Sequence, residues 1–384
     1  MGVSTFYDDN VPQRNDLRVG DEALSLSSRL ALSRQSERLK LNLEYTPYGL
    51  LYRRLDHYNS IDHNANLNAI LWLSSHFNVG LRDTFSYQNG IFQSVTGQPI
   101  LSGLGPPTAL NQAIFPYTTR MLSNTTGVDL TYVKSARTSL AFSGDFDRRQ
   151  FGDPVVNQVL YNSWGVSGGL QYRYRVSELT SFGLLLVHRD STFRGGAVIG
   201  NSPRFQGESA LLSVGSRLSP TVTLTIFGGP QYIHMLGQPA GASGTTGQFH
   251  AAGGGSFTKE VRNTALEMSA QRTVTDGGGM YTLVKNTALD CGVRRRLVGR
   301  WEANLHIGAA RADASIFEFA SGRTDALLGG FGVVRPLWGG ATFHASYETA
   351  HELTTGTLKY LANFDRNRVT IGIDYRFKPI SLGR

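Results

Sequence analysis

The sequence is poor in the features that mark several common classes of protein. Cys291 is the one cysteine among 384 residues, which excludes an internal disulfide framework and any site built from several cysteine ligands. Charged residues make up 17% of the chain, against about 25% in average soluble domains. No apolar run reaches the ~18 residues of a transmembrane helix. A hydrophobic content of 40% is nevertheless too high for a disordered chain, so the apolar residues must be dispersed through an ordered one.

Lysine is also scarce, because 31 of the 37 basic residues are arginine and only six are lysine. The net charge of +8 is spread along the chain and not gathered in a patch or tail, so we do not expect a nucleic-acid partner. Arginine instead indicates forked contacts to carboxylate or phosphate groups. No signal peptide is visible, and we expect the sequence to begin after an export signal.

What the sequence does contain is strict alternation, in which apolar residues recur at every second position. This is the period of a β-strand with one apolar and one polar face, and no helical spacing explains it. The pattern recurs in residues 39–46, 163–175, 221–226 and 301–307. It is clearest near the C-terminus, where the alternating apolar and polar residues are Val369, Ile371, Ile373, Tyr375 and Phe377, and Arg368, Thr370, Gly372, Asp374 and Arg376.

The connections alternate between short turns and long loops, as they do in outer-membrane barrels. Short turns are predicted at 34–37, 74–76, 135–137, 176–178, 219–221 and 262–263, and long loops at 48–62, 88–117, 152–158, 194–204, 235–247 and 315–321. Counting back from the last strand requires a first strand at Val3–Tyr7 and a second at Asp21–Arg34. We therefore predict an all-β fold, a single transmembrane antiparallel up-and-down β-barrel over residues 1–384. It should have about 18 strands, with about 16 as the fallback.

The polar face of such a barrel lines its lumen, so the phase of each strand predicts the lumen residues. Rings of arginine attract anionic solutes in anion pores, whereas arginines paired with lumen acids only stiffen the wall, and both interpretations stay open here. The predicted basic set is Arg29, Arg82, Arg149, Arg173, Arg175, Arg217, Arg294, Arg296 and Arg376. The predicted acidic set is Glu44, Asp145, Asp147, Glu267, Glu302, Glu348 and Asp374.

Catalytic and metal motifs are weak in this sequence. Gly165–Gly169 matches the pattern of a nucleophile elbow, but it lies inside an alternating strand with no helix after it. His57 and His63 lie near Asp56 and Asp62 without a distinctive ligand spacing. We therefore expect no enzyme, no cofactor and no metal. A Ser/His/acid set assembled across strands would be sought around His306 or His344.

Short motifs carry a resemblance to a known class. Phe6–Val11 with Asp16, Leu43–Tyr45 with Tyr52, and His63–Leu67 resemble the first strands of the β-barrel porin families tied to exopolysaccharide operons. Ile373–Phe377 resembles the terminal insertion signal of outer-membrane barrels, although seven residues follow it. The resemblance implies polysaccharide secretion, insertion by the barrel-assembly machinery and a place in the bacterial outer membrane.

The leading hypothesis is an outer-membrane channel whose arginine-rich lumen passes a hydrophilic, anionic solute such as an exopolysaccharide. The alternatives are a general diffusion porin, or a structural, adhesive or enzymatic barrel with a plugged lumen. The expected partners are outer-membrane lipid and anionic polysaccharide or small anionic solutes. The sequence does not predict an oligomeric state.

Overall fold

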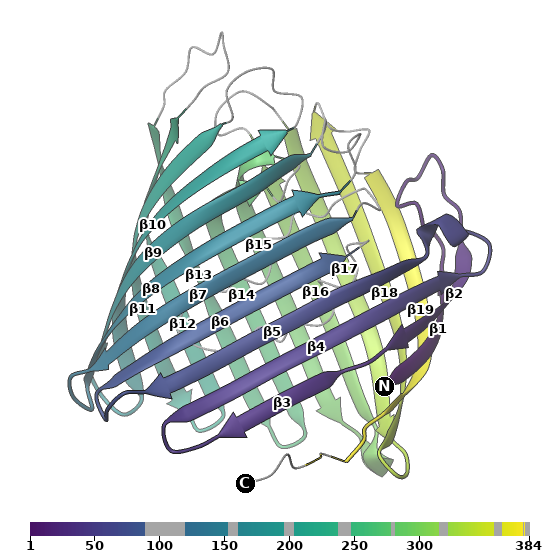
Figure 1. The fold of residues 1–384 in the computed structure, drawn as a ribbon, viewed down its shortest axis with the longest axis horizontal. Coiled ribbons are helices and arrows are strands. Elements are labelled where there is room, and N and C mark those ends of the chain that lie inside the picture. Colours follow the sequence, from purple (N-terminus) through teal and green to yellow (C-terminus); the bar gives the residue numbers. More distant parts are fainter. Residues whose placement is uncertain are drawn as a thin grey trace.

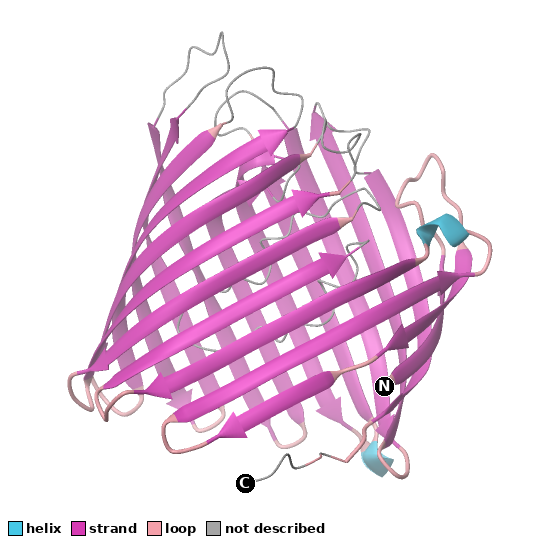
Figure 2. Ribbon diagram, viewed as in Figure 1, coloured by secondary structure: helices cyan, strands magenta, loops and turns pink. Residues whose placement is uncertain are grey.

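A computed structural model shows the chain as one antiparallel sheet that closes into a barrel (Figure 1). The structure describes residues 1–88, 120–152, 160–195, 203–236, 247–277, 281–314, 322–356, 363–378 and 380. Strands account for nearly all of these residues, and the helical elements are two short 3-10 turns, η1 (Asp56–Tyr58) and η3 (Val298–Arg300) (Figure 2). Among the described residues, no helix is long and apolar enough to cross a membrane.

The strands follow one another around the wall in chain order, each antiparallel to its neighbours. Most have 12–16 residues, more than the roughly 9–11 that a tilted strand needs to cross a bilayer. In order they are β1 (Gly2–Asp8), β2 (Asp21–Ser27), β3 (Leu30–Gln35), β4 (Leu39–Tyr52), β5 (Ser60–Trp72), β6 (Phe77–Gln88), β7 (Met121–Val133), β8 (Thr138–Phe151), β9 (Tyr161–Arg175), β10 (Thr180–Gly195), β11 (Arg204–Ser219), β12 (Val222–Leu236), β13 (Gly247–Val261), β14 (Thr264–Gly277), β15 (Tyr281–Arg296), β16 (Glu302–Asp313), β17 (Gly322–Pro336), β18 (Ala341–Gly356) and β19 (Asn363–Tyr375).

The predicted strand count of 18 is confirmed, because β2 and β3 are two halves of one strand. Both pair with β4 in the same register, from Ser27 opposite Tyr48 to Leu30 opposite Tyr45. The ladder is interrupted between them at Pro47, which has no N–H to donate, although its carbonyl still accepts from the Ser28 amide at 3.1 Å. The 19 ladder segments are therefore 18 strands of the barrel wall.

The first strand closes the barrel. β1 pairs with β19 on one side, from Gly2 opposite Asp374 to Asp8 opposite Arg368, and with β2 on the other. The predicted first strand at Val3–Tyr7 is thus confirmed. The closed ladder has no open edge there. Strand pairing thus gives the backbone N–H and C=O groups the hydrogen bonds that lipid cannot offer.

The predicted short turns are present, but one predicted long loop is wrong. We expected a loop over residues 48–62. Instead the β4–β5 ladder continues through it, with Tyr48 opposite Asp62 and Leu50 opposite Ser60, and the connection shrinks to residues 53–59. Apart from Gln88, the predicted loop at 88–117 lies outside the described residues, as do most residues of the other long connections.

The two faces of the wall differ in chemistry. Two residues that face each other in a ladder point to the same side of the sheet. The inward and outward positions of one strand therefore fix those of the next, around the whole barrel. The outer face carries exposed large apolar side chains, among them Leu81, Phe142, Leu184, Leu212 and Ile371. This apolar outer surface faces lipid, and the opposite face lines the lumen.

Candidate functional site: the inner wall

The inner wall holds the side chains that can meet a solute, and strand phase places the predicted set there. All the predicted lumen residues except Arg29 and Arg376 lie in strands at inward-facing positions. Arg29 lies between β2 and β3 and pairs with the inward Glu44 at 2.7 Å, and Arg376 directly follows β19.

One ion-pair group spans three neighbouring strands. The Arg82 guanidinium on β6 lies 3.2 Å from Asp129 on β7 and donates to Asp145 on β8. It reaches β8 because Gly127 of β7 lies between them, and a Cβ at Gly127 would meet both the Arg82 and Asp145 side chains. The absence of a side chain therefore permits the contact.

Replacing Gly127 with valine should break the Arg82–Asp145 pair, because the new side chain would occupy the space that the pair now fills. Both groups are partly exposed to lumen water, so we expect a loss of about 1 kcal/mol or less. Urea unfolding in detergent, followed by tryptophan fluorescence, measures it. Gly144→Val is the matched control, since a Cβ there meets nothing within 4 Å. Equal stability of the two variants would contradict the assigned role of Gly127.

A second pair repeats this arrangement two strands further on. Arg189 of β10 donates to Asp147 of β8 at 3.0 Å. Gly165 of β9 lies beside this contact, and a Cβ there would meet the carboxylate of Asp147. The sequence analysis missed Arg189, although Phe182, Leu184 and Leu186 face outward on the same strand and so predict an inward position 189.

Below these pairs, toward the short turns, the wall is basic. Arg173 and Arg175 end β9 on the inner face, and Arg217 ends β11 and donates to the Pro220 carbonyl at 3.1 Å. In the part of the chain that the structure describes, no inward position of β9, β10, β11 or β12 carries Asp or Glu. We call Arg173, Arg175 and Arg217 the basic wall.

Hydroxyl and glycine residues surround the basic wall. Arg173 faces Ser139 on β8 and Gly183 on β10. Arg175 faces Ser181 on β10. Small neighbours leave room around the guanidinium groups and offer hydroxyls beside them.

Two other predicted arginines, Arg294 and Arg296, have an acid close by in the ladder. Arg296 on β15 faces Glu302 on β16, and Arg294 is two residues away on the same face. Asp374 on β19 lies 3.1 Å from the His344 ring, and Glu348 faces Arg368. Glu267 faces Gly292 on β15. These positions therefore mix both charge signs, unlike the basic wall.

A buried charge group lies where β1 closes the barrel, and we call it the seam cluster: Asp8, Arg366 and Arg368. The Asp8 side chain is fully buried and accepts from Arg366, with Nε to Oδ2 at 2.8 Å, and from Arg368 at 3.3 Å. The Arg368 guanidinium also lies 4.4 Å from the centre of the Phe6 ring. None of these three residues was among the predicted lumen residues, and Asp8 directly follows the predicted first strand at Val3–Tyr7.

Above the end of β1, a loop takes over as the partner of β19. Asp9 accepts from the Asn367 amide at 2.7 Å, and Asn10 donates to the Asp365 carbonyl at 2.8 Å. Burial acts to raise the pKa of Asp9, but hydrogen bonds from Asn367 and Arg18 outweigh it and hold that pKa below its usual value. Asp9 therefore stabilises the seam above the unfolded-state pKa, and this contribution is lost as the pH falls through the lowered one.

An apolar cluster lines the inner wall at the end opposite the short turns. The strands β13 and β14 pair only as far as Gly253 opposite Arg272. Beyond this point Val274 of β14 packs with Phe193, Phe205 and Ile233 of β10–β12. Gln231 of β12 takes the place of a ladder partner, donating to the Val274 carbonyl and accepting from its amide, both at 2.9 Å. The ends of β14 and β15 therefore lean over the inner faces of β10–β12.

The inner wall offers little support for catalysis. Gly165–Gly169 lies wholly within β9, without the strand-to-helix turn of a nucleophile elbow. Within the described ranges, no serine is hydrogen-bonded to His306 or His344, and no group of three His, Cys, Asp or Glu side chains is placed to hold a metal. His63 instead faces outward and bonds to the Tyr45 hydroxyl at 2.7 Å.

Comparisons with known proteins agree with this architecture. No protein-family model matches the sequence, and no curated protein sequence is significantly similar. The FrpB iron transporter from Neisseria meningitidis matches at 10% identity and a TM-score of 0.52, over 98% of this chain and 67% of that one. The ferric citrate transporter FecA in its unliganded form matches at 10% identity and a TM-score of 0.51, over 97% of this chain and 63% of that one.

These likenesses, at 10% identity, show the fold. The chain spans about two thirds of the length of the two transporters. Its closed antiparallel ladder and apolar outer face are those of an outer-membrane β-barrel, which places the protein in the bacterial outer membrane.

Proposed function

We propose that the protein is an outer-membrane channel that passes hydrophilic, anionic solutes. The basic wall carries the proposal, because its three arginines line β9 and β11 on a stretch of inner wall where no described inward residue of β9–β12 is an acid. Arg82 and Arg189, by contrast, are neutralised by Asp145 and Asp147. Net positive charge in a narrow aqueous passage attracts anions.

The preferred solute class is an anionic oligosaccharide or polysaccharide. Arginine pairs with carboxylates through two parallel hydrogen bonds, and the serine hydroxyls next to Arg173 and Arg175 can both donate to and accept from sugar hydroxyls. This chemistry supports the resemblance to exopolysaccharide-associated barrels. A general diffusion porin is the alternative.

Conductance in planar lipid bilayers tests the proposal. Under a KCl gradient we expect an anion-selective reversal potential. The triple variant Arg173→Gln, Arg175→Gln and Arg217→Gln should lower the chloride-to-potassium permeability ratio roughly twofold or more, since charged rings set selectivity. A cation-selective or nonselective wild-type channel, or the absence of conductance, would refute the proposal.

The matched control also removes three arginines but leaves the inner wall intact. Arg34, Arg295 and Arg335 face outward on β3, β15 and β17. Replacing these three with glutamine should leave the permeability ratio unchanged. Adding a polyuronate then separates solute classes, because an oligosaccharide channel should be blocked by it and a general porin should not.

A further inference from the structure

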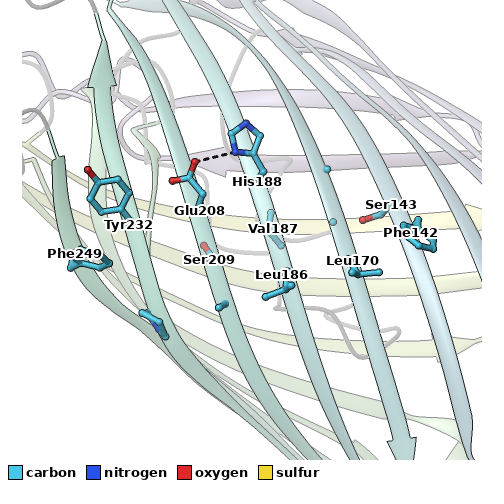
Figure 3. A pocket seen from close by; sticks show the side chains of 14 residues that line it. Phe142, Ser143, Leu170, Leu186, Val187, His188, Glu208, Ser209, Tyr232 and Phe249 are labelled. Carbon is cyan, nitrogen blue, oxygen red and sulfur yellow. Dashed lines mark hydrogen bonds and ion pairs between the residues drawn. The ribbon is translucent and has the colours of Figure 1, made fainter.

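The outer wall carries a groove over β8–β13, on the face turned toward lipid (Figure 3). Its volume is about 710 Å³. Phe142 of β8 forms one side, and Tyr232 and Phe249, with ring centres 4.7 Å apart, form the other. Leu170 and Leu186 lie between them, as Figure 3 shows.

Small residues and a break in the ladder explain the depth of the groove. A Cβ at Gly168 would meet nothing within 4 Å, so the wall there is bare backbone. Ala210 and Pro230 are adjacent on β11 and β12, and the ladder skips this position, since Pro230 has no N–H to donate. The floor is thus lower than the neighbouring wall, where leucines and aromatic residues project.

The groove ends where the outer wall changes from apolar to charged. At its upper end, His188 Nδ1 on β10 lies 3.1 Å from the Glu208 carboxylate on β11. Asp190, the next outward-facing residue of β10 after His188, accepts from Arg204 at 2.8 Å and from Gln206 at 3.1 Å. Charged side chains on a lipid-facing wall are tolerated near the membrane surface and costly at its centre, so this boundary marks the membrane surface.

The charged region above the groove is rich in arginine. Besides Arg204, it includes Arg148 on β8 and Arg194 on β10, both exposed and both on the outer face opposite Trp164 and Asn162. The region holds three cations, Arg148, Arg194 and Arg204, against two carboxylates, Asp190, which pairs with Arg204, and Glu208, which contacts His188. The charged region therefore carries a positive excess beyond the upper end of the groove.

We infer that this groove is a lipid-binding site that holds the acyl chain of a phosphate-bearing lipid of the outer leaflet. The chain lies against Leu170, Leu186 and the bare backbone at Gly168, and the phosphate is bound by Arg148 and Arg194 at the membrane surface. An apolar groove below a cationic rim matches a molecule with an apolar chain and an anionic head. The site lies on the opposite face of the wall from the basic wall and does not depend on the proposed transport.

Native mass spectrometry of the intact barrel with added lipid tests this site. Phosphatidylglycerol serves as the anionic probe and phosphatidylcholine with the same chains as the zwitterionic control. We expect tighter binding of phosphatidylglycerol, and Arg148→Gln with Arg194→Gln should reduce that preference by about fivefold for each arginine. Gly168→Trp should fill the groove and weaken both lipids.

Ala309→Trp is the matched control, because Ala309 also faces outward, on β16 between Leu289 and Leu327. It should leave binding of both lipids unchanged. Equal affinity for the two lipids, or binding by Gly168→Trp at the wild-type level, would overturn the inference. A dimer seen in the mass spectrum of the wild type and lost in Gly168→Trp would also overturn the inference, because the groove would then be covered by a second copy of the chain.

Discussion

Replacing Asp8 with asparagine should destabilise the barrel by about 3–5 kcal/mol, the usual cost of removing one partner of a buried ion pair. The side chains of Asp8 and Arg366 are at most 4% exposed, and Asp8 is also the carboxylate that Arg368 contacts. Without its negative charge, two buried guanidinium groups would lie side by side at the point where β1 closes the ladder. The amide of asparagine fits the same space, so the effect isolates charge from shape.

Urea unfolding in detergent, followed by tryptophan fluorescence, measures the loss. Asp16→Asn is the matched control, since it removes an exposed carboxylate that pairs with Arg14 in the loop after β1. An exposed pair contributes at most about 1 kcal/mol. The double variant Asp8→Asn with Arg366→Gln should recover part of the loss, because it removes one of the two cations that contact Asp8. If Asp8→Asn were no less stable than Asp16→Asn, the seam cluster would not hold the barrel closed.

The second large effect is expected at Gln231, whose side chain replaces a missing ladder partner. Gln231→Leu keeps the apolar surroundings of Ile233 and Phe205 but removes the acceptor of the Val274 amide and leaves its carbonyl only the 3.4 Å contact from Thr273. Each buried backbone group left unpaired costs about 1–3 kcal/mol. We expect a matching loss of stability and faster hydrogen exchange at the Val274 amide.

Two further variants separate this role from general damage. Gln35→Leu makes the same chemical change at an exposed position of β3 and should have little effect. Gln231→Glu keeps an acceptor for the Val274 amide and loses the donor to its carbonyl. The Val274 amide should therefore exchange more slowly in Gln231→Glu than in Gln231→Leu. Unchanged exchange at Val274 in Gln231→Leu would show that the ends of β14 and β15 are held by the apolar cluster alone.

Most of the barrel was predictable because its signal is local. Alternation along a strand depends only on the period of the backbone, so residues such as Ile371 and Arg173 could be assigned to faces without knowing their neighbours. The short turns and the first strand followed from the same pattern. The loop predicted at 48–62 was wrong because Pro47 interrupts one ladder, with β2–β3, while the ladder with β5 continues.

The sequence predicted which residues line the inner wall, but not which of them form ion pairs with one another. Strand phase assigned Arg82, Asp145 and Arg173 to one face. It did not show that Arg82 reaches across β7 to Asp145 over Gly127, or that β9–β12 have no inward acid near Arg173. Such pairings depend on which strands are neighbours and on their register. The alternation of residues along one strand carries no information about either.

The sequence by itself determined the fold class, the number of strands and the face on which most charged residues lie, because all three follow from periodicity and turn spacing. Only the tertiary structure decided which charges are neutralised, how Asp8 joins the two ends of the chain, and where the outer wall is hollowed. The reason is physical. Contacts such as Asp8 with Arg366 join residues far apart in sequence, and closure of the sheet brings them together.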